Sequence, residues 1–166
     1  MNFEIVKIKE LSGKETSIYS IYVEEYGETL FDRFIRENEQ NFPSELDNIL
    51  DRLDVIGFET GAREDFFKLR EGKPGDGVCA LHDRPNDKLR LYCIRYGMDI
   101  IILGGGGEKS YDTRAWQDDE KLTEEAELII NISAYVTEML KEGDISYTDD
   151  GKDFKGEGLK QIDDEE

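Results

Sequence analysis

The chain has 166 residues, of which 37% are hydrophobic and 10% aromatic, so it can form one domain with a sizeable core and is too apolar to be wholly disordered. Its net charge of −19 repels polyanions from the molecule as a whole and excludes general nucleic-acid binding over its surface. Because the sequence lacks a run of about 18 apolar residues, and its start lacks a basic segment followed by an apolar stretch, it predicts neither a membrane span nor a secretion signal.

The N-terminal segment predicts a β-hairpin. The runs "FEIVKI" (3–8) and "SIYSIYVEEY" (17–26) are rich in β-branched and aromatic residues. Ser12, Gly13 and Lys14 between them favour a turn.

The next segment predicts two helices. Apolar residues recur there at helical spacing in two runs, and Pro43 favours the start of the second helix. Gly57 or Gly61 can end that helix in a left-handed cap. Two helices joined by a short link predict an antiparallel helical hairpin that covers a sheet. The apolar positions are Leu30, Phe31, Phe34 and Ile35 in the first run and Leu46, Ile49, Leu50, Leu53 and Ile56 in the second.

The central segment predicts three antiparallel strands, "VCALHD" (78–83), "KLRLYCIRYG" (88–97) and "MDIIILGG" (98–105). In the second of these, Leu89, Leu91 and Cys93 share one face, and Arg90, Tyr92 and Tyr96 point to the other. This alternation predicts a sheet with one face on a core and one face in water.

The glycine run "GGGGEKS" (104–110) ends in Lys-Ser, as a phosphate-binding P-loop does. That motif requires glycine at positions 103 and 108, which here are Leu103 and Glu108, and it requires a helix directly afterwards. The segment "YDTRAWQDD" that follows has no helical period, so a nucleotide site is not predicted. Two interpretations remain open: the glycines allow close approach to a ligand, or they make a kinked exit from the sheet.

The C-terminal third predicts one helix and a tail. Residues 118–143 have an apolar stripe, begin with acidic residues and end at Gly143, which is typical of a helix. Residues 144–166 are strongly acidic and predict a mobile tail, in which Ile145, Tyr147 and Phe154 can dock lightly. The chain therefore predicts an α+β fold, with residues 1–143 as a single domain: a helical hairpin on a small antiparallel sheet, an N-terminal β-hairpin and a C-terminal helix.

The two cysteines, Cys79 and Cys93, lie in apolar strand-like runs. They are interpreted as small buried hydrophobes in a reduced, cytoplasmic setting. One histidine and two separated cysteines do not predict a zinc site.

The element order, together with "GAREDFFKLREGKPGDGVCALHD", "KLRLYCIRYG" and "DIIILGGGGEKS", resembles the RelE/HigB-like toxin superfamily, in the branch with phage-derived members. The resemblance covers about residues 28–142. It implies a ribosome-associated mRNA endonuclease that works without a metal or other cofactor. The implied partners are ribosome-bound mRNA and a cognate antitoxin protein, with no membrane involved.

The resemblance also implies a set of site residues. Arg90 would stabilise the phosphorane, Lys109 would hold phosphate, and His82, whose ordinary pKa suits proton transfer near neutrality, would be the acid–base group. Tyr92 and Tyr96 would stack on bases or donate a proton, and Arg114 would add positive charge. The alternatives are that His82 is a surface residue beside Asp83 and that Arg90 only solvates the strand or pairs with Asp87.

The charge distribution limits where RNA could bind. Residues 61–115 carry ten basic and nine acidic residues, a balance of +1, whereas the other 111 residues carry 11 basic and 31 acidic ones, a balance of −20. A polyanion would therefore be tolerated only near the central segment. The same distribution favours an alternative function, a non-catalytic acidic binding protein on this fold that engages a basic protein partner.

Overall fold

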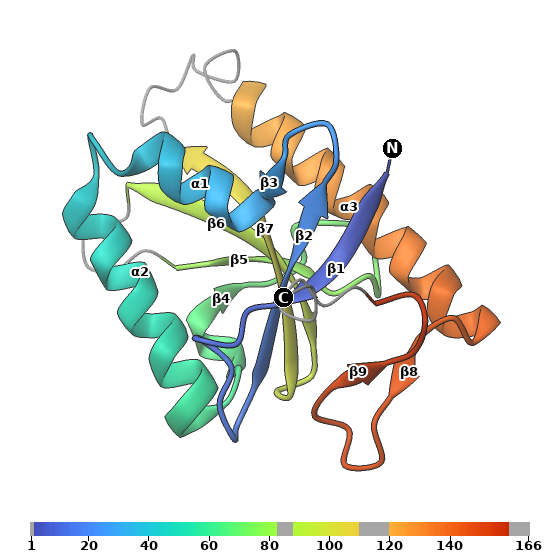
Figure 1. The fold of residues 1–166 in the computed structure, drawn as a ribbon. Helices are drawn as coiled ribbons and strands as arrows, with labels where there is room; N and C mark the ends of the chain where they lie inside the picture. Colours follow the sequence, from blue (N-terminus) through green and yellow to red (C-terminus); the bar gives the residue numbers. More distant parts are fainter. Residues whose placement is uncertain (1, 83–87, 110–119, 160–166) are drawn as a thin grey trace.

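A computed structural model gives the fold of the chain and describes residues 2–82, 88–109 and 120–159 (Figure 1). Among these residues there are three α-helices and two short helical turns, with the strands between them. The elements are β1 (Phe3–Lys7), β2 (Ser17–Val23), β3 (Glu28–Thr29), α1 (Leu30–Asn38), α2 (Pro43–Val55), a π-helical turn η1 (Ile56–Thr60), a 3-10 turn η2 (Glu64–Phe66), β4 (Phe67–Lys68), β5 (Val78–Leu81), β6 (Leu89–Tyr96), β7 (Ile100–Glu108), α3 (Glu120–Glu142), β8 (Ser146–Tyr147) and β9 (Phe154–Lys155).

The main sheet is mixed, with the strand order β1-β2-β7-β6-β5-β4 and β3 paired with β2. The predicted N-terminal hairpin β1-β2 and the predicted central strands β5-β6-β7 are both antiparallel, as expected. The expectation of a wholly antiparallel sheet is wrong at one place. Residues 17–20 of β2 run parallel to residues 100–103 of β7, and this pairing joins the N-terminal hairpin to the central strands. The fold is therefore α+β with a mixed sheet.

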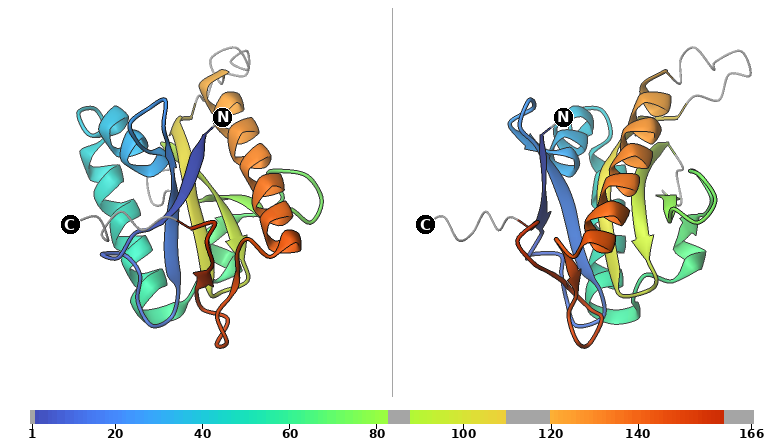
Figure 2. Two further views of the ribbon diagram at one scale, coloured as in Figure 1. Left: turned by 45° about the vertical axis from the view of Figure 1, so that its right-hand side comes forward. Right: turned by 90° about the vertical axis from the view of Figure 1, so that its right-hand side faces the viewer.

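Helices cover both faces of this sheet (Figures 1 and 2). On one face, α1 and α2 bury Phe34 and Leu53 against Leu91 and its neighbours. On the other face, α3 buries Ile129 and Val136 in a second core. The expectation that one sheet face is open to water is therefore wrong. The apolar stripe of α3 must be buried, and the second face of the sheet is the surface that buries it.

Residues 144–159 also pack onto this second face, so the fold does not end at residue 143 as predicted. Ile145 and Phe154 are buried, and the Phe154 ring contacts the rings of Tyr19 and Tyr96 at centroid distances of 5.4 and 5.3 Å. Tyr147 remains 45% exposed. The predicted docking of this segment is thus far more extensive than light contact, and residues 160–166 lie outside the described residues.

A partly buried polar junction fixes this segment. The Tyr19 hydroxyl donates to Oδ1 of Asp153 at 3.0 Å and accepts from the backbone N–H of Phe154 at 3.0 Å. The Asp153 carboxylate also pairs with Lys7 Nζ at 2.8 Å. The junction therefore ties the C-terminal hairpin β8-β9 to the N-terminal strands.

The Asp153 carboxylate is expected to make stability depend on pH. Burial raises its pKa, but hydrogen bonds from Lys7, Ser17 and Tyr19 outweigh burial, so its pKa in the folded chain is lowered. A carboxyl with a lowered folded pKa contributes stability that is present above its unfolded pKa of about 4 and is lost as the pH falls through the folded value. We expect Asp153→Asn to lower the unfolding temperature at pH 7 by a few degrees and to weaken the loss of stability on acidification below about pH 5.

Thermal unfolding followed by circular dichroism at a series of pH values measures this dependence of stability on pH. Asp149→Asn changes an exposed carboxylate of the same hairpin and is the matched control. If both variants gave the wild-type pH profile, the junction would not contribute.

Candidate functional site

Three of the predicted site residues come together at one end of the sheet. His82 directly follows β5, Arg90 lies near the start of β6, and Lys109 directly follows β7. Leu81 pairs with Leu91, so the antiparallel register brings His82 beside Arg90, and Arg90 in turn pairs with Gly107 of β7. The backbone N–H of Lys109 donates to the carbonyl of Lys88 at 2.8 Å. We call His82, Arg90 and Lys109 the strand-end cluster.

The electrostatic environment of Arg90 is set by one carboxylate. Arg90 Nη1 lies 3.4 Å from Oε1 of Glu71, and Nζ of Lys68 lies 3.7 Å from Oε2 of the same residue. The Arg90 side chain is 23% exposed. Glu71 therefore faces two cations, and exposed Lys88 and Glu108 lie at the same strand ends. The alternative partner Asp87 lies outside the described residues.

Of the two predicted RNA-binding tyrosines, Tyr92 is buried and Tyr96 is partly buried. Tyr92 is 4% exposed and belongs to the core beneath α3. The Tyr96 ring packs against Phe154, and its hydroxyl is buried without a hydrogen-bond partner among the described residues. Burial also raises the pKa of Tyr96 well above its ordinary value, so its phenol stays protonated. Base stacking on this face is therefore not available in this conformation, because α3 and the C-terminal segment cover it. The remaining predicted residue, Arg114, lies outside the described residues.

The glycine run is not a loop but the second half of β7, buried from Gly104 to Gly107. A Cβ atom at Gly106 would lie 1.8 Å from the carbonyl oxygen of Arg90, and one at Gly105 would lie 2.4 Å from Oε1 of Glu125. The glycines are therefore needed for close approach, but the atoms that approach them belong to the protein itself. A register irregularity opposite Tyr92 accompanies the first two glycines. The run serves to pack β7 tightly between β6 and α3.

A network of ion pairs joins α1 to α3 beside these glycines, and the sequence reasoning missed it. Glu125 of α3 is 4% exposed and pairs with Arg33 of α1, while Lys121 Nζ lies 2.7 Å from Glu125 and 3.2 Å from Glu37. A signal was present: Glu125 lies three residues after Leu122 and four before Ile129, on the apolar stripe of the helix. A carboxylate on such a stripe must find a cation.

The cysteines match their interpretation as small buried hydrophobes. Cys79 and Cys93 are free and buried, and their sulfur atoms lie 3.6 Å apart. The hydrogen bond to Cys79 and burial raise the pKa of Cys93, which keeps the thiol protonated and unreactive. Over residues 2–82, 88–109 and 120–159, no group of three or more His, Cys, Asp or Glu side chains is placed to hold a metal ion. None of the helices in these ranges has the length and apolar character needed to cross a membrane.

Comparison with known proteins adds no family to this description. No family model matches the chain, and neither curated proteins nor solved structures give a match. A functional proposal therefore rests on the geometry and charge of the strand-end cluster and its surroundings.

Proposed function

We propose that the chain is an RNA-cleaving toxin of the RelE/HigB-like kind, a ribosome-associated mRNA endonuclease that a cognate antitoxin neutralises. The observation that carries the proposal is the position of His82, Arg90 and Lys109 at the adjacent ends of three neighbouring strands. The order of two helices, a three-stranded antiparallel meander and a closing helix supports the same proposal.

The cluster has the groups that attack by a ribose 2′-hydroxyl requires. His82 accepts the proton of the 2′-hydroxyl, whose oxygen bonds to the adjacent phosphorus while the bond to the 5′ oxygen breaks. The 5′ oxygen takes a proton from water as it leaves, His82 gives its proton back to water, and the products are a 2′,3′-cyclic phosphate and a 5′-hydroxyl end. Arg90 stabilises the extra negative charge of the phosphorane with its guanidinium donors, and Lys109 holds the phosphate.

The covered sheet face restricts how RNA reaches the cluster. Because α3 and residues 144–159 lie on that face, the transcript has to approach the strand ends and not lie across the sheet. The phosphate must also compete with Glu71 for Arg90. The near-neutral charge balance of residues 61–115 allows RNA to approach there, whereas the acidic remainder of the chain repels the RNA phosphates.

The proposal is tested by induced expression in bacterial cells, with cleavage of ribosome-bound mRNA followed by primer extension. We expect the wild type to arrest growth and Arg90→Ala to lower cleavage by about 100-fold or more, because it removes a phosphorane-stabilising cation. Arg36→Ala removes an exposed arginine of α1 that pairs with Glu28 and does not belong to the cluster, so this variant should remain active. A harmless wild-type protein, or equal losses in both variants, would overturn the proposal.

A second candidate function is engagement of a basic protein partner without catalysis. The observation in its favour is that the acidic excess lies outside the central segment, where the balance is −20. A wild-type protein that does not cleave mRNA in the assay would be consistent with this binding function.

A further inference from the structure

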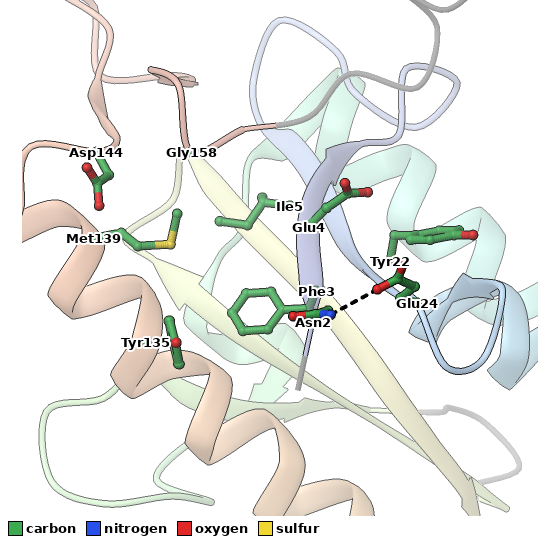
Figure 3. A pocket seen from close by; sticks show the side chains of 10 residues that line it. All are labelled: Asn2, Phe3, Glu4, Ile5, Tyr22, Glu24, Tyr135, Met139, Asp144 and Gly158. Atoms are coloured by element: carbon green, nitrogen blue, oxygen red, sulfur yellow. Dashed lines mark hydrogen bonds between the residues drawn. The ribbon is translucent and has the colours of Figure 1, made fainter.

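We propose that a groove between β1 and α3 binds an extended, basic segment of a protein partner. The groove has a volume of about 690 Å³ and is shown in Figure 3. Phe3 and Ile5 line it from the edge strand β1, and Tyr135 and Met139 line it from α3. We call it the β1–α3 groove. It lies away from the strand-end cluster, and the inference does not depend on the nuclease proposal.

Carboxylates dominate the polar part of the groove. Glu4, Glu24 and Asp144 line it, and a neighbouring depression of about 380 Å³ on the other side of Tyr135 is lined by Glu138 and Glu142. No lysine, arginine or histidine is among the described residues that line either depression. Such a surface attracts cationic side chains and repels nucleic acid.

The apolar part of the groove suits the stems of lysine and arginine. The rings of Phe3 and Tyr135 meet edge to face, with centroids 5.2 Å apart, and Tyr135 remains 60% exposed. An arginine side chain can lay its methylenes on these rings and on Met139 while its guanidinium meets the carboxylates. Asp144 lies on the same side as this apolar surface, and Glu4 and Glu24 lie across the edge strand β1 (Figure 3), so a long basic side chain suits the groove.

The backbone of β1 indicates that the bound segment is extended. The carbonyl of Asn2 accepts from the N–H of Glu24, and the N–H of Ile8 donates to the carbonyl of Ile18, so even-numbered residues bond to β2. Strand alternation then turns the N–H and C=O of Phe3 outward, along the groove. The chain's own Leu159 forms a parallel bridge to Ile5 on this same edge, so the edge can pair with an added strand.

The test uses the ¹⁵N-labelled full chain and a short N-acetylated peptide of alternating arginine and valine. We expect saturable shifts of the amide resonances of Phe3, Tyr135 and Met139, and no such shifts with a peptide of alternating glutamate and valine. The combined variant Glu24→Gln, Glu138→Gln and Asp144→Asn should weaken binding about tenfold, since it removes three cation contacts. Tyr135→Ala should also weaken it.

The matched control removes the same charge from the opposite side of the sheet. Asp47, Asp51 and Asp54 are exposed on α2, and their combined change to Asn should alter affinity less than about twofold. Equal weakening by the two combined variants, or shifts spread over α2, would show non-specific attraction and overturn the proposal. Arg90→Ala should bind the peptide as the wild type does, which separates this site from the strand-end cluster.

Discussion

Gly106→Ala is expected to destabilise the fold by more than about 3 kcal/mol, which is above the usual range for a single substitution. A Cβ atom at this position would lie 1.8 Å from the carbonyl oxygen of Arg90 and 2.8 Å from its carbonyl carbon. Both are backbone atoms of β6, so no side-chain rotation relieves the overlap. β6 and β7 would have to separate where Leu91 pairs with Gly106, between the two cores. Urea unfolding followed by circular dichroism measures the loss.

The neighbouring Gly107→Ala is the matched control. There a Cβ atom would meet Lys121 Cγ at 3.4 Å and Leu122 Cδ2 at 3.7 Å, which is ordinary contact with movable side chains. We expect a change of no more than about 1 kcal/mol, since alanine also restricts the unfolded chain. A large and equal loss in both variants would mean that the glycine run is needed for its backbone flexibility and not for the approach of β6. Gly106→Ala should also displace Arg90 and so disrupt the strand-end cluster.

The local elements could be predicted because their signals lie within short windows. The β1-β2 hairpin follows from two β-rich runs around a turn, and α2 follows from Pro43 and a regular apolar period. The face alternation of β6 was also right: Leu89 and Leu91 lie in one core, and Tyr92 lies in the other. Alternation shows that two faces differ, but it does not show what covers the second one.

The errors concern contacts between distant segments. The parallel pairing of β2 with β7, in which Ser17 lies opposite Ile100, joins two strands that are distant in the sequence. No local sequence pattern predicts such a pairing. The docking of residues 144–159 depends on Ile145 and Phe154, two apolar side chains in a strongly acidic segment, and composition there pointed to a mobile tail. Once these residues pack on the sheet, the Tyr96 ring contacts Phe154 and is only partly exposed.

In the candidate site, too, the local contacts could be predicted from the sequence and the contacts between distant segments could not. The proximity of His82 and Arg90 follows from the register of two strands joined by a short connection, which the sequence indicated. The partner of Arg90 did not follow from it, because Glu71 lies on the segment before β5 and reaches Arg90 only through the fold. Glycines favour loops by intrinsic propensity, and the packing of α3 on β7 overrides that propensity here.

Glu125→Ala is expected to cost about 3 kcal/mol or more, because it removes the carboxylate that holds two cations between helices on opposite sides of the sheet. Glu125 is 4% exposed, and the Arg33 side chain is only 13% exposed, so Arg33 would be left largely buried without its partner. Lys121 would lose its 2.7 Å contact. Thermal and urea unfolding measure the loss, and Glu124→Ala, which changes the exposed neighbour on α3, should have little effect.

A double substitution distinguishes the contribution of the Glu125 charge to stability from that of its packing. The double variant Arg33→Met with Glu125→Leu removes both charges and keeps similar side-chain volume beside Gly105. Because a buried ion pair replaced by apolar groups is often neutral in stability, we expect this variant to recover most of what Glu125→Ala loses. If it were as unstable as Glu125→Ala, the shape of the Glu125 side chain against β7, and not its charge, would be what joins α1 to α3. Recovery would instead mean that apolar side chains can replace the ion pair between α1 and α3. The glycines of β7 would then require only that a side chain of similar volume fills the position of Glu125.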